Sequence, residues 1–291
     1  MMKNPILVTG ATGTVGRELV TQLLERNDRV RAMVHDMSKA DGLAEKGVEI
    51  VMGDLNNPED VRLAVDQVEK IYLLTPVTPN MVEMTKIMRE EAERAGVRKI
   101  VKQSLLGCDS APFTTFGKLH HDCEKVLKAS GMGQTFLRPN QFMQNFINYY
   151  GDGIRRKDVI AKPCGDGRTS FIDARDIAAA ATVVIEGNWH DGKTYSITGP
   201  ESIGNADVAR ILSDVTGRPI SYVDVPVEEY RRQMSTWGMG DFMMNGMMDV
   251  LEAERSNRGS AVTRDFQHLT GRQPNSFARF ARDNAVSFAK L

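Results

Sequence analysis

The sequence lacks long apolar runs, an excess of charge of either sign and any regular cysteine pattern. Its 291 residues carry a formal net charge of −1, so we expect no binding surface for nucleic acid or for an anionic membrane. The three cysteines are odd in number and far apart, which indicates neither a disulfide framework nor a zinc site and favours a reducing cytoplasm. The apolar run within residues 1–10 is too short for a signal peptide or a membrane helix.

Short apolar runs and amphipathic helical segments alternate through the first half of the chain. This alternation predicts a parallel sheet with helices on both faces, and therefore an α/β protein with a Rossmann-type, doubly wound parallel sheet. We expect a first domain over residues 1–150. Residues 151–291 form a mixed segment that returns partly to the sheet and builds a smaller α/β substrate lobe. The expected strands of the first domain are Ile6–Thr9, Val30–Val34, Val48–Met52, Lys70–Leu74, Ile100–Lys102 and Gln134–Leu137.

A glycine-rich turn separates the first expected strand from the helix that follows it. Glycine permits a tight turn and a close approach of backbone to phosphate, and the helix N-terminus offers unpaired N–H groups. A turn without a ligand is the alternative, but the flanking strand and helix favour a dinucleotide site. The expected cofactor-binding residues of this turn are Gly10, Ala11, Thr12, Gly13, Thr14, Val15 and Gly16.

The end of the second expected strand, Met33-Val34-His35-Asp36, decides between the two nicotinamide dinucleotides. A carboxylate at this position holds the ribose hydroxyls of NAD and repels the 2′-phosphate of NADP. We place His35 at the selective position with Lys39 four residues later, a basic pair that favours NADPH. Two alternatives stay open: both are solvated loop residues, or Asp36 takes the carboxylate role and the cofactor is NAD(H).

Two further strand ends contribute candidates for cofactor binding. Asp54 and Leu55 follow the third strand, where the carboxylate can accept from the adenine amino group and the leucine can pack on the ring. The alternative for Asp54 is a helix cap before Pro58. Thr75 and Pro76 end the fourth strand, at the edge where ligands bind in open α/β sheets.

The glycine spacing resembles the extended and atypical short-chain dehydrogenases/reductases. In that family a tyrosine donates a proton to a carbonyl, a lysine four residues later lowers its pKa, and a serine polarises the substrate. Ser104 resembles that serine, but Phe116 stands at the tyrosine position and His120 at the lysine position. Phenylalanine has no exchangeable proton. We therefore expect hydride transfer to an acceptor that needs little acid help, with His120 either a proton source or a packed helix residue.

Segments along the whole chain resemble the NmrA-like branch of this family, especially its type 2 NADPH:quinone oxidoreductases and triphenylmethane reductases. The most specific segment is Phe-Leu-Arg-Pro-Asn-Gln-Phe-Met-Gln-Asn at 136–145. Others lie at 104–106, 124–131, 173–178, 195–201 and 270–277. The resemblance implies an NADPH-dependent reductase of quinone-like or dye-like acceptors, with NADH as an alternative cofactor. It equally allows a non-catalytic NADP(H)-binding redox sensor, and leaves an isomerase or imine-type reductase open.

The resemblance also implies roles for individual residues. Arg138 and Pro139 would border the nicotinamide, while Ser104 and Asn140 would orient the acceptor. The residues expected to contact the acceptor are Phe142 and Met143. The family often has arginine where this chain has His35, which weakens the inference to NADPH.

Methionine is unusually frequent, with 16 residues in the chain. Six of them crowd an irregular segment, at positions 234, 239, 243, 244, 247 and 248. Methionine fills irregular apolar gaps and adapts to flat ligands, so we expect either core filling, a dimer contact or a mobile lid over the acceptor. The expected partner is a small aromatic acceptor, with no metal, nucleic acid or membrane, and the protein is expected to be a monomer or a homodimer.

Overall fold

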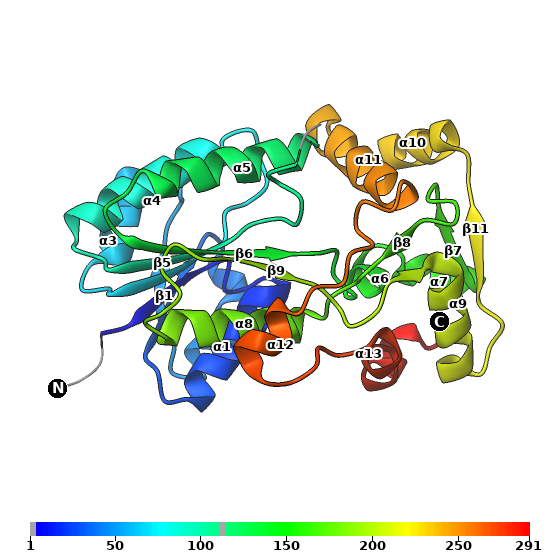
Figure 1. Cartoon of the computed structure of the whole chain (residues 1–291), viewed down its shortest axis with the longest axis horizontal. Coiled ribbons are helices and arrows are strands. Elements are labelled where there is room, and N and C mark those ends of the chain that lie inside the picture. The colour runs from blue at the N-terminus through cyan, green and yellow to red at the C-terminus, as the bar shows by residue number, and fades with distance from the viewer. Residues whose placement is uncertain (1–3, 111–113) are drawn as a thin grey trace. The chain divides into compact units, whose positions relative to one another are not determined.

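The computed structural model describes residues 4–110 and 114–291 and divides into two compact units (Figure 1). The first unit contains residues 4–109, 116–138 and 177–195. The second contains residues 139–176 and 196–291, together with residues 110, 114 and 115. The expected boundary at residue 150 falls inside the second unit. Residues 177–195 return to the first unit.

A seven-stranded sheet organises the first unit, in the order β3-β2-β1-β4-β5-β6-β9. Adjacent strands from β3 to β6 are parallel. The Phe136 N–H donates to the Lys193 carbonyl at 3.0 Å, next to β9. The order reverses between β1 and β4, where a ligand crevice is expected. These findings confirm the predicted Rossmann-type fold. The strands are β1 (Ile6–Thr9), β2 (Val30–Val34), β3 (Glu49–Met52), β4 (Lys70–Leu73), β5 (Lys99–Gln103), β6 (Gly133–Pro139) and β9 (Thr194–Ile197).

Helices cover both faces of this sheet (Figure 1). One face carries α3 (Pro58–Val65), α4 (Met81–Arg94) and α5 (Thr115–Lys128), and the other carries α1 (Thr14–Glu25) and α8 (Ala174–Glu186). The connection from β2 to β3 contains η1 (Met37–Lys39) and α2 (Asp41–Ala44). All four residues of β1 are buried, which explains why this strand reads as a continuous apolar run rather than an alternating one. Within residues 4–110 and 114–291, no helix combines the length and the apolar character that crossing a bilayer requires.

The second unit is a mixed α/β structure around an aromatic core. Strands β7 (Val159–Lys162) and β11 (Ser221–Asp224) pair in parallel, while β8 (Arg168–Thr169) and β10 (Ile203–Gly204) pair antiparallel. The Phe146 ring meets the Phe171 and Phe277 rings edge to face, each at 5.2 Å between centroids. The helices of this unit are α6 (Asn145–Asn148), α7 (Gly151–Lys157), α9 (Asn205–Thr216), α10 (Val227–Thr236), α11 (Asp241–Arg255), α12 (Asp265–Thr270), α13 (Phe277–Asp283) and η2 (Ala285–Phe288).

The methionine-rich segment is regular, contrary to the expectation from its sequence. It forms α10 and α11, because methionine is a good helix former, and Gly238 turns the chain between them with φ of +72°. Met234, Met244 and Met248 are buried and pack with Leu251. Core filling, the first of the three interpretations, therefore holds for these three methionines. The structure gives no support to the lid hypothesis.

A buried ion pair joins β7 to α11 in the second unit. The Lys162 Nζ lies 2.8 and 2.9 Å from the two carboxylate oxygens of Glu254, and both side chains are almost fully buried. The Asn205 Nδ2 donates to Glu254 Oε1 at 2.6 Å, and the Tyr150 ring centroid lies 4.9 Å from the ammonium. Because both charges are removed from water, each depends on the other for compensation.

We expect Glu254→Ala to lower the free energy of unfolding by about 3–5 kcal/mol, because it leaves the Lys162 charge buried and unpaired. Urea denaturation followed by circular dichroism measures the loss. The matched control is Glu252→Ala, an exposed position on the same helix, which changes the free energy by less than about 0.5 kcal/mol. Replacing the pair together, by Lys162→Met with Glu254→Leu, recovers most of the loss. Equal stability of the Glu254→Ala and Glu252→Ala variants would contradict the pairing.

Candidate cofactor site

The glycine-rich turn after β1 has the geometry of a phosphate-binding loop. Gly10 has φ of +66°, and its carbonyl accepts from the Gly13 N–H at 3.0 Å. A Cβ atom at Gly16 would lie 2.1 Å from the same carbonyl oxygen, so only glycine fits there. Gly13 is the N-cap of α1, and among the described residues no side chain caps this helix. Its first amides therefore remain open to an anion such as a diphosphate.

Arg17 adds a cation to this turn that the sequence analysis did not single out. Its Nε donates to the Thr12 carbonyl at 2.8 Å, and the side chain is exposed. The signal in the sequence was a basic residue in the first turn of the helix after the glycines. Acidic residues are usual at that end of a helix, so a cation there favours an anionic ligand.

A cavity of about 320 Å³ lies beside the turn, along the carboxyl ends of β1 to β4. The structure thus brings four predicted residues from three separate strand ends to the turn: His35, Asp54, Leu55 and Pro76. The other lining residues include four apolar side chains, those of Met33, Val34, Leu74 and Met84. A mainly apolar cavity with a few polar groups at its edge is typical of a ligand site, and this one is of the size to hold an adenosine.

His35 lines the cavity, whereas Asp36 and Lys39 turn toward each other. Asp36 accepts from the Ser38 N–H at 3.0 Å and from the Ser38 hydroxyl at 2.7 Å, and Lys39 Nζ lies 3.5 Å from its other oxygen. The two hydrogen bonds from Ser38 lower the pKa of Asp36, which caps η1. The arrangement favours His35 as the residue that faces the ribose, and leaves Lys39 outside the cavity lining.

An Asx turn fixes Asp54 at the edge of the cavity. One carboxylate oxygen accepts from the backbone N–H and the side-chain amide of Asn56, both at 2.9 Å, and the backbone bond lowers the pKa of Asp54. The N-cap of α3 is Asn57, whose side chain accepts from Glu59. The helix-cap alternative for Asp54 is therefore wrong. Within residues 4–110 and 114–291 its second oxygen accepts no hydrogen bond, which leaves that oxygen available to a ligand.

A buried lysine lies behind the end of β4. The Lys102 Nζ donates to the Thr75 hydroxyl at 3.1 Å and to the Gln103 carbonyl at 2.7 Å. Burial lowers the pKa of Lys102 to about 8. Thr75 is buried and does not line the cavity, so the structure does not place it, unlike Pro76, against the cofactor space.

His120 is a buried, neutral imidazole. It is 8% exposed, and within the described residues its Nδ1 has no hydrogen-bond partner. Burial, together with the positive charge of Lys102, lowers the pKa of His120 to about 3. Burial and the lowered pKa favour the second of the two alternatives for His120, a packed helix residue rather than a proton source.

Ser104 belongs to a network centred on Glu124. The Ser104 hydroxyl donates to Glu124 Oε1 at 2.7 Å, and Arg138 donates to both carboxylate oxygens at 2.9 and 2.7 Å. Arg138 also donates to Asp109 at 2.5 Å. Burial alone would raise the pKa of Glu124, but the hydrogen bonds from Arg138 and Ser104 lower it to about 2. The Ser104 proton and the Arg138 guanidinium are thus both hydrogen-bonded to carboxylates. Arg138 therefore has a structural role that the sequence analysis did not predict.

Asn140 is committed to contacts within the second unit. Its amide donates to the Ser170 hydroxyl and to the Gly259 carbonyl, both at 2.8 Å, and its oxygen accepts from the Gln141 N–H. Asn140 is 6% exposed. Both amide protons are therefore used in holding β6 to neighbouring loops, which contradicts a role as a free donor to the acceptor.

The remaining predicted residues after β6 differ in exposure. Met143 is 1% exposed and belongs to the aromatic core of the second unit, so its prediction as a substrate contact is wrong. Pro139 is buried at the end of β6. Phe142 is partly exposed and forms a single bridge to Ile172. Of the two predicted substrate contacts, only Phe142 offers surface to a ligand.

Comparison with known proteins shows the family of the chain. Residues 2–263 match the NmrA-like family. An NAD(P)H azoreductase from Xenophilus azovorans is 34% identical over 283 residues, covering 97% of this chain and 99% of the relative. The structure of an NADPH-dependent quinone oxidoreductase from Escherichia coli, solved with NADPH, aligns with a TM-score of 0.87 at 24% identity, covering 97% and 99% of the two chains. Triphenylmethane reductase from Citrobacter sp. aligns with a TM-score of 0.84 at 24% identity, covering 96% and 99%. The chain belongs to the NmrA-like family.

Proposed function

We propose that the protein is an NADPH-dependent reductase that passes a hydride directly to a quinone-like or dye-like aromatic acceptor. One observation carries this proposal: a phosphate-binding turn and an adenosine-sized cavity meet where His35, rather than a carboxylate, follows β2 and lines the cavity. The similarity to an NAD(P)H azoreductase supports the same class of reaction. We also place the protein in the cytoplasm, because its three free, buried cysteines suit a reducing compartment.

The residues of the first unit fit NADPH. The amides at the start of α1 hold the diphosphate, and Arg17 adds a compensating charge. His35 faces the 2′-phosphate, with Lys39 close by in sequence. Asp54 accepts from the adenine amino group while Leu55 packs on the ring. When bound, NADPH supplies the hydride.

The nature of the acceptor follows from what the protein does not provide. Phe116 has no exchangeable proton, and His120 is neutral and buried. The Ser104 hydroxyl already donates to Glu124. Because none of these three side chains is placed to protonate an oxyanion, we infer an acceptor that either spreads the incoming negative charge over its own ring, as quinones do, or is a cation that the hydride neutralises, as triphenylmethane dyes are. The protein then acts mainly by positioning two flat rings.

The phosphate-binding turn is tested by Gly16→Ala. The added Cβ collides with the Gly10 carbonyl and forces the turn open, so we expect the Kd for NADPH to rise at least about tenfold. Isothermal titration calorimetry measures it. Gly42→Ala is the control, since a Cβ there meets nothing within 4 Å. Arg17→Gln, an exposed change that removes the positive charge and the hydrogen bond to the Thr12 carbonyl, weakens binding by about threefold. Unchanged NADPH binding by both the Gly16 and the Arg17 variants would place the diphosphate elsewhere.

Cofactor choice is tested by His35→Asp. A carboxylate at this position repels a 2′-phosphate and accepts from ribose hydroxyls, so kcat/KM with NADPH falls by about tenfold or more while kcat/KM with NADH is kept. His35→Asn, which adds no charge, serves as the matched control. If the ratio of the two kcat/KM values does not move in His35→Asp, another residue reads the ribose.

Catalysis is tested by steady-state NADPH oxidation with a panel of benzoquinones, naphthoquinones and azo dyes. We expect turnover above about 1 s⁻¹ with at least one acceptor. Because the pKa of His120 is about 3, the rate shows no ionisation near pH 6.5, and His120→Gln keeps most of the turnover. Tight NADPH binding with no turnover on any acceptor would instead favour a non-catalytic dinucleotide sensor.

A further inference from the structure

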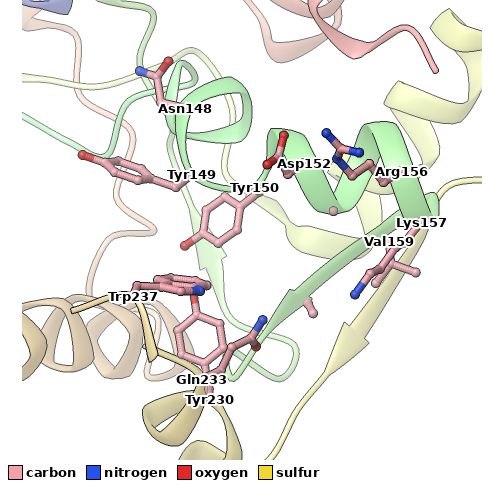
Figure 2. A pocket seen from close by; sticks show the side chains of 12 residues that line it. Asn148, Tyr149, Tyr150, Asp152, Arg156, Lys157, Val159, Tyr230, Gln233 and Trp237 are labelled. Atoms are coloured by element: carbon pink, nitrogen blue, oxygen red, sulfur yellow. The ribbon is translucent and has the colours of Figure 1, made fainter. Parts of the chain in front are cut away.

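A second cavity, of about 470 Å³, lies entirely within the second unit (Figure 2). It is formed by the end of α6, by α7, by β7 and by α10. None of its lining residues was singled out from the sequence, and none belongs to the glycine turn or the cavity beside it. Its volume falls within the range of small-molecule sites in proteins.

Four aromatic side chains form one side of this cavity. Tyr150 and Tyr230 both line this side, and the Trp237 ring meets the Tyr230 ring edge to face at 6.4 Å. Figure 2 shows the Tyr150 hydroxyl pointing toward Tyr230 and Trp237. Tyr149 is 63% exposed and Trp237 is 54% exposed. Large aromatic side chains exposed together around a hollow favour a flat ligand that covers them.

Two basic residues, Arg156 and Lys157, lie at the other side of the cavity, at the end of α7 (Figure 2). Among the described residues, neither Arg156 nor Lys157 has a carboxylate oxygen within 4.0 Å, and both are exposed. Asp152 also lines the cavity, but its carboxylate is paired with Arg155 at 2.5 Å. An aromatic cluster alone attracts cations, but here the two free positive charges oppose a cationic ligand and favour an anionic one.

We propose that this cavity binds a planar aromatic anion, such as an aryl sulfonate or an aryl carboxylate. Tyr149 and Trp237 cover the faces of the ring, and Tyr150 and Tyr230 close the apolar end. Arg156 and Lys157 hold the acidic group. The proposal concerns binding and does not depend on the reductase activity proposed above.

Binding is tested on the full chain by calorimetric titration with naphthalene-2-sulfonate. We expect saturable binding with a Kd below about 1 mM. The neutral analogue 2-naphthol binds at least about fivefold more weakly, and a naphthyl trimethylammonium ion more weakly still. Trp237 reports the site directly, because the chain has two tryptophans and the other, Trp189, is 88% exposed in the first unit. In Trp189→Phe protein, the sulfonate changes the remaining fluorescence with the same Kd.

The double variant Arg156→Gln with Lys157→Gln separates a ligand role from a purely structural one. Basic residues in the last turn of a helix also interact favourably with the helix dipole. If Arg156 and Lys157 had only that role, replacing them would leave ligand binding unaffected. We expect the double variant to bind the sulfonate at least about tenfold more weakly and 2-naphthol unchanged. The control is Arg210→Gln with Arg279→Gln, which removes the same charge from exposed positions of the same unit.

Thermal unfolding shows that each variant is folded before it is titrated. Failure of the sulfonate to saturate folded wild-type protein would overturn the proposal. So would equal binding of the sulfonate and the trimethylammonium ion. Equal loss of affinity in the Arg156/Lys157 variant and in the Arg210/Arg279 control would also overturn it, since the effect would then come from net charge and not from the cavity.

Discussion

The candidate cofactor site depends on one close approach, that of Gly16 to the carbonyl of Gly10. A Cβ would lie 2.1 Å from that oxygen, so the first turn of α1 can pass over the end of β1 only without a side chain. The approach aims the uncapped amides of α1 at the edge of the sheet, where the order of strands reverses. His35 and Asp54 reach the same edge because β2 and β3 run parallel to β1. The shape of the cavity thus depends on the turn after β1, in which a side chain at position 16 would not fit.

The Glu124 network explains why Ser104 is not free to donate its proton to a ligand. Glu124 is buried on α5 and binds Arg138 at the end of β6 and Ser104 after β5. Removing one of these side chains would leave a buried charge without full compensation, so each member of the network depends on the others. The same bonds that secure α5 against the sheet occupy the serine hydroxyl. With Phe116 on the same helix, the chemistry left to the site is hydride transfer between flat rings, in which placement matters more than proton donation.

The sequence was sufficient for the fold and for several residues that line the candidate cofactor cavity, because both depend on local patterns. Buried strands read as apolar runs, and the residue after a parallel strand lies at the ligand edge whatever its partners are. The rest depended on partners distant in sequence. The commitment of Ser104 and Asn140, and the low pKa of His120, follow from burial and from contacts that spacing does not encode. The burial of Met143 in the core of the second unit could not be predicted either, because an apolar residue reads alike in the sequence whether it faces a ligand or a core.

The second unit shows how a buried charge can shape a surface cavity. The Lys162 ammonium lies 4.9 Å from the Tyr150 ring and is held there by Glu254. A cation against one face of the ring fixes the tyrosine in place. The wall of the aromatic cavity is therefore set by contacts beneath it before any ligand arrives. A preorganised wall costs a ligand little ordering free energy, so even a small aromatic anion can bind through two stacking faces and one charged group.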